Sequence, residues 1–363
     1  MKFSILTSLL IAVAVTAAAT AMVASPARAA DAALPDAKPV PAVQVTPLPY
    51  DQAAFEHLGR ELTRYHFSEG LRRPFWYPMV GPGGRSLTRM GMPGDPARSV
   101  TQDGQPEDPN HPANPGGHSH QSSVWISHKD VGGIDFWRDG GPIAGQIVHQ
   151  FVADGFHYTD GDKAVMMSVN AWNGPDGKAL MIDRRRSTVA PGEGDSWWLV
   201  VDLQLEATKG GEVTLGKTPF GPIGVRMAKS VGVDDGGGRI LNSEGQLNEK
   251  EAFRKPARWV DYSGPILGEE TGGVTLMDHP ANPRHPAPFN VRDNGWMGPA
   301  LTLEEPMTIK DGEPVRLRYG FWVHAGVPSL EELNRQWQTF AAEEMAPFEK
   351  PATVAPAAKP ESK

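Results

Sequence analysis

The sequence predicts an all-β protein, a large antiparallel β-sandwich with one helix near its C-terminus. Runs of β-branched and aromatic residues recur along the chain with partial alternation, which is typical of strands. Turn sequences such as "NGPDG", "PGEGD" and "DDGGG" separate these runs. The chain also contains 40 glycines, 34 prolines and 10 tryptophans, a composition that favours a turn-rich β protein over a helical bundle.

The clearest strand prediction is "WWLVVDLQLEAT", residues 197–208. Alternate residues of this strand point to opposite faces. One face would carry the apolar residues Leu199, Val201, Leu203 and Leu205, and the other the more polar group Val200, Asp202, Gln204 and Glu206. Such a strand buries one face in the core and leaves the other face more exposed to solvent. Further strands are predicted within 163–172, 273–277 and 315–326. The "RRR" run at 184–186 is interpreted as a solvated sheet edge that resists aggregation.

One helix is predicted over "SLEELNRQWQTFAAEEM", residues 329–345. Ser329 and Glu332 have the spacing of a capping box, which satisfies the first backbone N–H groups of a helix. An apolar stripe at helical spacing would pack on the sandwich: Leu330, Leu333, Trp337 and Phe340.

The two ends of the sequence predict an exported chain with one folded domain. Residues 1–29 have the outline of a signal peptide: Lys2 precedes an apolar run, and Ala27-Arg28-Ala29 gives the small-x-small cleavage pattern. A single membrane anchor is the alternative. We therefore expect a periplasmic or secreted protein. Residues 30–45 predict an Ala/Pro-rich linker, 46–346 the domain and 347–363 a disordered tail.

Composition and absent motifs exclude several functions. The chain has 43 acidic and 35 basic residues, which argues against nucleic acid or, after signal cleavage, a membrane as partner. It contains no Walker A loop and no G-x-G-x-x-G after a strand, so no nucleotide cofactor is expected. Neither G-x-S-x-G nor H-E-x-x-H occurs, and without cysteine no thiolate site or disulfide can form.

Chemistry-bearing residues gather first in "GHSHQSSVWISHKDVGGIDFW", residues 117–137. If this segment is extended, His118 and His120 point to the same face and could share a substrate or a metal ion. The alternative is a pair of loop histidines without a ligand. Trp125 could stack on a sugar ring, although packing in the core is the more common role of tryptophan.

A second gathering is "DHPANPRHPAPFNVRDNGW", residues 278–296, a proline-stiffened loop rich in His, Asp and Arg. The alternative is a structural loop whose charges pair with one another. The candidate catalytic residues from both segments are His118, His120, Asp278, His279 and His285. The candidate substrate-binding residues are Arg89, Trp125, His128, Asp135, Arg226 and Arg284. The candidate metal ligands are His118, His120 and His279.

Several blocks of the sequence resemble the PmoA-like family, which is labelled methane oxygenase PmoA and is in substance a domain of unknown function. The matching blocks are "RRPFWYPMVGPGGRSLTR" (72–89), 117–137, "GQIVHQ" (145–150), "ARWVDYSG" (257–264), 273–296 and "LRYGFWVHAG" (317–326). Many members carry a second adjacent His and an Arg after the H-x-H pair, where this chain has Gln121 and Ser122. The resemblance implies a sandwich similar to the galactose mutarotase-type supersandwich. Methane oxidation is rejected, because methane oxygenase subunits are multi-spanning membrane proteins, whereas this sequence predicts no membrane-spanning helix beyond the signal peptide.

Three functions remain open. The first is a secreted carbohydrate-active enzyme of epimerase, lyase or hydrolase type, in which histidine moves a proton on a sugar or oxidised sugar. The second is a non-catalytic glycan-binding module, which would present a row of exposed aromatics on a flat face. The third is a metalloprotein with a His-ligated divalent ion. For the enzyme, we expect the segments 118–128 and 278–285 to converge in one pocket, with Asp278 orienting one imidazole.

Overall fold

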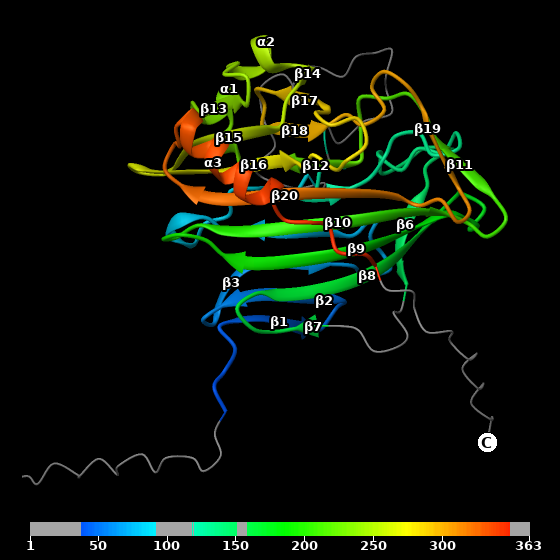
Figure 1. Ribbon diagram of the computed structural model, residues 1–363, viewed down its shortest axis with the longest axis horizontal. Coiled ribbons are helices and arrows are strands. Elements are labelled where there is room, and N and C mark those ends of the chain that lie inside the picture. The colour runs from blue at the N-terminus through cyan, green and yellow to red at the C-terminus, as the bar shows by residue number, and fades with distance from the viewer. Residues whose placement is uncertain (1–37, 92–117, 119, 151–157, 349–363) are drawn as a thin grey trace, which may run out of the picture. The chain divides into compact units, whose positions relative to one another are not determined.

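Antiparallel strands form most of the regular secondary structure in the described part of the computed structural model (Figure 1). The structure describes residues 38–91, 118, 120–150 and 158–348. The predicted signal peptide, most of the predicted linker and the chain after Phe348 lie outside the described residues. Contacts group the described residues from Pro41 onward into one unit. None of the described helices is long and apolar enough to cross a membrane.

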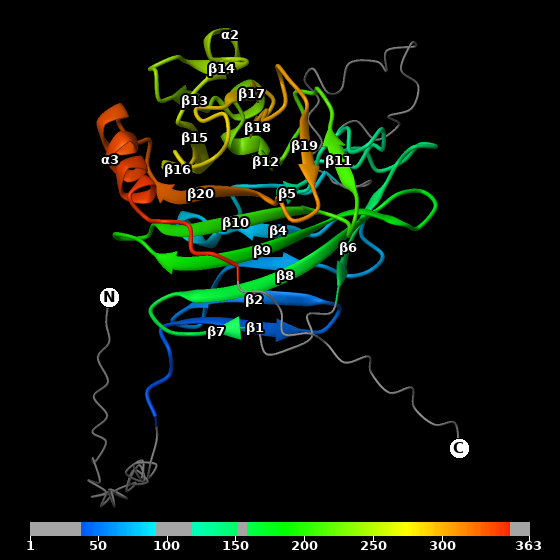
Figure 2. The same cartoon turned by 45° about the vertical axis from the view of Figure 1, so that its right-hand side comes forward.

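Two nine-stranded antiparallel sheets form this unit. In spatial order, the first sheet contains β1 (Val43–Leu48), β2 (Gln52–His57), β3 (Arg60–His66), β4 (Phe75–Met79), β5 (Val124–Ile126), β12 (Ile223–Arg226), β18 (Trp296–Pro299), β17 (Pro288–Arg292) and β14 (Lys255–Pro256). The second contains β13 (Arg239–Asn242), β15 (Trp259–Leu267), β16 (Glu270–Asp278), β20 (Val315–Ala325), β10 (Trp197–Ala207), β9 (Ala179–Pro191), β8 (Ala164–Asn173) and β6 (Gln146–Gln150), with β7 (Tyr158–Thr159) also paired to β8. A small third sheet pairs β11 (Glu212–Leu215) with β19 (Met307–Lys310), on the side away from α3 (Figure 2).

The two large sheets pack their apolar faces into one shared core, so the predicted antiparallel β-sandwich is confirmed. Tyr65 and Trp76 of the first sheet and Leu199 and Val201 of the second belong to the same buried cluster. The predicted alternation of β10 holds, because Leu199, Val201, Leu203 and Leu205 are all buried. The opposite face of β10 carries Asp202 and Gln204, which are also buried. Neighbouring polar side chains and the end of the C-terminal helix cover them.

The predicted C-terminal helix is α3 (Leu330–Ala341), and it lies against β16 and β20 (Figure 1). The Ser329 side chain accepts a hydrogen bond from the Glu332 backbone N–H, as half of the predicted capping box requires. Leu333 and Phe340 are buried, whereas Leu330 is exposed and does not join the apolar stripe. Gly320 allows this close packing, because a Cβ there would lie 2.8 Å from the Phe340 ring. Two single-turn helices, α1 (Val233–Gly236) and α2 (Asn248–Ala252), were not predicted.

The arginine run at 184–186 is not a sheet edge, contrary to the sequence-based interpretation. It lies in β9, between β8 and β10. Arg185 points into the sandwich and is fully buried, where its Nε and Nη2 donate to Asp183 at 2.8 and 2.7 Å. Arg184 and Arg186 face the other way and pair with acids of β10. The three charges are accommodated because each has an acidic partner on its own or the adjacent strand.

The predicted domain limits shift at both ends. The first strand begins at Val43, within the range predicted as linker, because Val43 and Val45 are buried in the sandwich core. At the other end Phe348 is buried, and the Arg186 guanidinium lies 4.8 Å from its ring centroid. Among the described residues, packing into the domain therefore begins at Val43 and continues as far as Phe348.

Candidate functional site

The structure separates the candidate catalytic residues into two groups. His118 and His120 lie just before β5 and line one pocket. Asp278, His279 and His285 lie at and after the end of β16, beside α3. In the described ranges His120 contacts Arg73, His118 and Trp137, whereas Asp278, His279 and His285 contact one another's loop, α3 and the segment after it. The single converged site expected from the sequence is therefore not formed by these residues.

The first group opens into what we name the histidine pocket, a cavity of about 160 Å³. Its lining is His118, His120, Gln121, Lys129, Trp137, Arg138 and Phe220. The two imidazole centroids lie 5.7 Å apart. A turn in which the Gln121 N–H donates to the His118 carbonyl brings the two histidines together. Arg73, which is itself buried, donates to the His120 carbonyl at 2.8 Å and fixes this backbone against the sandwich.

Aromatic rings form the floor of the histidine pocket. Trp137 and Phe220 line it directly, with their centroids 5.4 Å apart. Beneath them Trp125 and Trp296 pack against Trp137 at 5.2 and 6.0 Å. Trp125 is fully buried, so it supports the floor and cannot itself stack on a ligand, contrary to its predicted role. Phe220, Lys129 and Arg138 were not predicted. Lys129 lies within the segment 117–137 and Arg138 follows it directly, whereas nothing local in the sequence links Phe220 to the H-x-H pair.

The electrostatics of the pocket favour a neutral His120. Burial lowers the pKa of His120 well below the ordinary value of 6.5, and electrostatic interactions with His118 and Arg73 lower it further. Arg226 and Arg138 act in the same direction. The neutral imidazole can therefore accept a proton near neutral pH. Lys129 and Arg138 supply positive charge to the lining, and its described residues include no carboxylate. Asp135, outside the lining, offsets part of this charge, because its Oδ2 lies 3.8 Å from Arg138 Nε.

Two predicted substrate-binding arginines, Arg89 and Arg226, are not among the described residues that line the pocket. Both are buried. Arg89 Nε donates to the Met227 carbonyl at 3.2 Å, and Arg226 Nη1 donates to Asn294 Oδ1 at 2.9 Å. Arg226 still affects the site electrostatically, since its charge helps to lower the pKa of His120.

Three other predicted substrate-binding residues hold loops together. Asp135 accepts hydrogen bonds from the backbone N–H groups of Trp137 and Arg138 at 2.8 and 3.0 Å. Arg284 donates to the carbonyls of Leu301, Glu305 and Pro306. His128 is buried between the Asp130 N–H and the Thr302 hydroxyl. These side chains have their polar atoms engaged by the protein, so binding roles for them are not supported.

His128 makes folding stability depend on pH. Burial lowers its pKa from 6.5 to about 4, against a smaller opposing contribution from Asp130. Between these two values the unfolded chain binds a proton that the folded chain does not, so the contribution of His128 is fully present above pH 6.5 and is lost as the pH falls towards 4. We expect His128→Gln to remove this component. The measurement is urea unfolding of both proteins across this range. An unchanged pH dependence in the variant would contradict the assignment.

The second group contains a histidine–aspartate pair. His285 Nδ1–H donates to Asp278 Oδ2 at 2.8 Å, so Asp278 orients this imidazole as the sequence analysis proposed for one histidine. The ring stacks on Trp337 of α3 at a centroid distance of 6.1 Å, and the Trp337 indole N–H donates to the Asp278 carbonyl. Asn282 also donates to the Asp278 carboxylate at 2.7 Å. These contacts fasten the loop after β16 to α3.

His279 also helps to hold the loop after β16 against the C-terminal helix region. Its Nδ1 accepts from the Ala281 N–H at 3.2 Å, and its Nε2 donates to the Glu343 carbonyl at 3.0 Å. Both ring nitrogens are therefore engaged, which does not suit the catalytic or metal-binding role predicted for His279. In the part of the chain that the structure describes, no three His, Asp or Glu side chains lie together in a way that could hold a metal ion.

Comparison with known proteins gives the family and no activity. No curated protein matches the chain. Among solved structures, the crystal structure of the Slr1438 protein from Synechocystis sp. PCC 6803 is similar at 9% sequence identity, with a TM-score of 0.30, over 78% of this chain and 96% of that one. A family model described as "Family of unknown function (DUF6807)" matches residues 52–338. This supports the expected domain of unknown function, and no finding supports the methane oxygenase label. The chain belongs to the family of unknown function DUF6807.

Proposed function

We propose that the protein binds an acidic or oxidised sugar in the histidine pocket and moves a proton on it. One observation carries this proposal: two imidazoles, two cationic side chains and two aromatic rings line the same pocket. Small-molecule sites typically combine an apolar lining with a few polar groups that converge on the ligand. This pocket is also where the predicted pair His118 and His120 meets side chains distant in sequence.

The charge of the pocket favours a sugar that carries a carboxylate. Lys129 and Arg138 line the cavity, whose described lining contains no acid. Of the nearby arginines, Arg138 lies 3.8 Å from Asp135 and Arg73 pairs with Asp139 at 2.9 Å, so Lys129 carries most of the charge argument. A cleft of one sign raises the local concentration of ligands of the opposite sign. Aromatic rings such as Trp137 and Phe220 offer a face for the apolar side of a sugar ring. A cavity of about 160 Å³ favours a single ring over an oligosaccharide.

His120 is the candidate base, because its lowered pKa leaves the imidazole neutral near neutral pH, although the same shift makes it a weaker base. A neutral imidazole can take the proton from a carbon next to a carboxyl or carbonyl group, and nearby cations stabilise the enolate-like charge that develops. Epimerisation and β-elimination both proceed this way. Hydrolysis in most glycosidases instead uses two carboxyl groups, and the described lining of the pocket contains neither Asp nor Glu. We therefore propose an epimerase or lyase activity in preference to a hydrolase.

A surface module for glycans receives less support. Such a module presents exposed aromatic platforms, whereas none of the ten tryptophans, all within the described ranges, is exposed. Most of them pack in the core, as the sequence analysis expected of the majority. Export to the periplasm or the exterior remains our proposal from the sequence of residues 1–29.

Charge selectivity tests the binding half of this proposal. We expect glucuronate or galacturonate to bind more tightly than glucose or galactose in calorimetric titrations at low salt, because Lys129 faces the ligand. Lys129→Ala should weaken binding of the acidic sugar about tenfold, as loss of one charged contact typically does. Added salt should reduce the preference. The matched control is Lys178→Ala, whose side chain is 86% exposed in the turn before β9.

The proposal fails if neutral and acidic sugars bind equally, or if Lys129→Ala and Lys178→Ala behave alike. Circular dichroism and thermal unfolding of each variant ensure that any loss of binding is not a loss of fold.

A further inference from the structure

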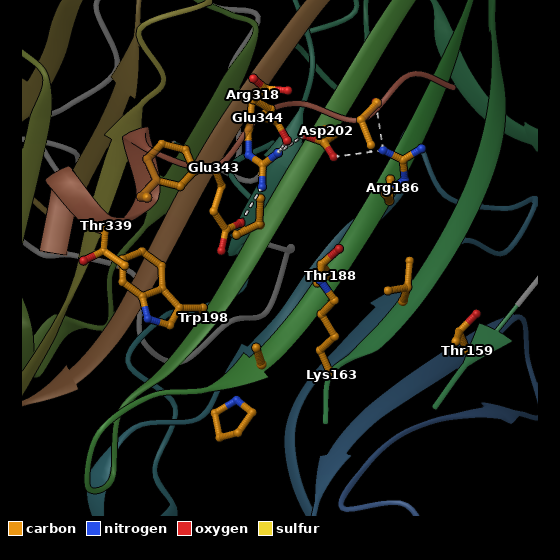
Figure 3. Close-up of a pocket in the computed structure, with 16 residues that line it drawn as sticks. Thr159, Lys163, Arg186, Thr188, Trp198, Asp202, Arg318, Thr339, Glu343 and Glu344 are labelled. Atoms are coloured by element: carbon orange, nitrogen blue, oxygen red, sulfur yellow. Dashed lines mark hydrogen bonds and ion pairs between the residues drawn. The ribbon is translucent and has the colours of Figure 1, made fainter. Parts of the chain in front are cut away.

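A larger pocket lies on the outer face of the second sheet, and the histidine pocket shares no residue with it. We name it the sheet pocket. It occupies about 460 Å³ between β8, β9 and β10 on one side and α3 with the segment after it on the other (Figure 3). Its polar side chains include Lys163, Thr188, Asp202 and Glu343, and Trp198 forms part of the apolar wall. Its volume is within the range typical of small-molecule sites.

A row of charges across three strands builds the polar side of the sheet pocket. Strand register places Asp202 of β10 directly opposite Arg186 of β9 and Arg318 of β20. Asp202 Oδ2 accepts from Arg186 at 3.3 Å, and its Oδ1 lies 3.5 Å from Arg318 Nη1 (Figure 3). The Asp202 side chain is only 4% exposed although it lines the cavity. A buried carboxylate with arginines on both sides is held in one position, as a ligand-binding group must be.

The C-terminal segment closes this pocket from above. Arg186 donates to the carbonyls of Ala346 and Pro347 at 3.0 and 2.8 Å. Arg318 donates to the Glu344 carbonyl and to the Glu343 carboxylate, both at 2.9 Å. The arginines that flank Asp202 therefore also fix the segment after α3, which turns an open sheet face into a cavity.

Trp198 supplies an aromatic platform. Its ring is half-buried and lies nearly parallel to Phe340 of α3, at a centroid distance of 6.4 Å and an angle of 10°. Trp322 packs beside it at 6.2 Å. Among the tryptophans, most are closed in the core, but Trp198 lines the cavity. Val165, Val200 and Pro191 extend the apolar surface around it.

The charges of the described lining balance, which points to a neutral ligand. Three cations, Lys163, Arg186 and Arg318, face three acids: Asp202, Glu343 and Glu344. Because positive and negative side chains are equal in number, the lining would attract neither anions nor cations selectively. Donors and acceptors side by side instead suit hydroxyl groups, which both donate and accept hydrogen bonds. We propose that the sheet pocket binds a neutral saccharide, with one sugar ring on Trp198 and hydroxyls toward Asp202, Thr188 and Lys163. At about 460 Å³ the cavity has room for more than one ring.

Titration with neutral disaccharides tests this site. The probes are cellobiose, maltose, lactose and xylobiose, measured by calorimetry and by saturation-transfer NMR. We expect at least one to bind, and Trp198→Ala to weaken its binding about tenfold, as truncation of a central aromatic contact does. Lys163→Gln, a change at an exposed side chain, should also weaken binding if Trp198→Ala unfolds the protein. Tyr50→Ala is the matched control, because Tyr50 is 85% exposed in the turn before β2.

The His120→Ala variant distinguishes binding in the sheet pocket from binding in the histidine pocket. His120→Ala should leave disaccharide binding unchanged, because His120 does not line the sheet pocket. The inference is overturned if none of the four disaccharides binds, or if Lys163→Gln and Trp198→Ala both bind as well as Tyr50→Ala. It is also overturned if His120→Ala abolishes disaccharide binding, since the probe then occupies the histidine pocket. Failure of the acidic-sugar titration would not affect this result.

Discussion

Asp183→Ala is expected to lower the free energy of unfolding by about 3–5 kcal/mol, because it leaves a fully buried guanidinium without its counter-charge. The Asp183 carboxylate accepts two hydrogen bonds from Arg185, and one each from Asn170 at 2.7 Å and from the Trp172 indole at 2.6 Å. Arg185 also donates to the Tyr65 hydroxyl of the opposite sheet at 3.4 Å. The cluster therefore joins the two sheets inside the core.

Urea unfolding measures this effect, because the midpoint reports stability and the slope reports whether unfolding stays two-state. Glu206→Ala is the matched control. It breaks the Arg184–Glu206 ion pair one residue away on β9, where both side chains are part-exposed, and should cost no more than about 1 kcal/mol. A double variant, Asp183→Leu with Arg185→Met, should recover much of the loss because it removes both buried charges. A cost for Asp183→Ala as small as that of Glu206→Ala would contradict the assigned role.

The sandwich was predictable because its signals are local. In β10 and β20 the alternation of apolar and polar residues follows from the two-residue period of a strand, whatever that strand pairs with. The helix α3 was likewise predictable from Ser329 and the spacing of Leu333 and Phe340. Leu330 was the exception, since a stripe position in the first helical turn is buried only if a neighbour covers that turn.

The arginine run shows why local patterns fail for buried charge. Three adjacent arginines usually indicate solvent, because an unpaired charge is costly to bury. Arg185 is nevertheless buried, with Asp183 two residues away and Tyr65 120 residues away. The Asp183 spacing was visible in the sequence. The contact with Tyr65 was not, because it depends on how the two sheets pack.

The candidate sites divide in the same way. The H-x-H pair, His118 and His120, lines the histidine pocket, and a hydrogen bond joins Asp278 to His285, seven positions further along the chain. The sequence could not show whether the two segments converge, because each is fixed by different neighbours. The backbone of His120 is held by Arg73, whereas the His279 ring is held by the Glu343 carbonyl after α3. The sheet pocket left no local motif, since its row Arg186, Asp202 and Arg318 is assembled from three strands.

His120→Ala is expected to reduce turnover of an acidic sugar by about a hundred- to ten-thousandfold, the usual contribution of a positioned general base. The fold should persist, because His120 lies before β5 and its backbone carbonyl, which Arg73 binds, is kept in the variant. The assay is deuterium exchange into uronates and keto-sugars in heavy water, followed by NMR. It detects proton abstraction whether the product is an epimer or an unsaturated sugar. His57→Ala, in β2 and outside the histidine pocket, is the matched control.

The pH dependence of exchange gives a second readout. Since burial and the neighbouring charges of His118 and Arg73 lower the pKa of His120, the neutral base persists as the pH falls below 6.5. Exchange by the wild-type protein should therefore continue below pH 6.5, where an ordinary histidine is already protonated. Exchange that is unchanged in His120→Ala, or that is lost in both proteins once a chelator is added, would remove His120 from the role of base. In the second case a metal-bound group would have to take the proton instead.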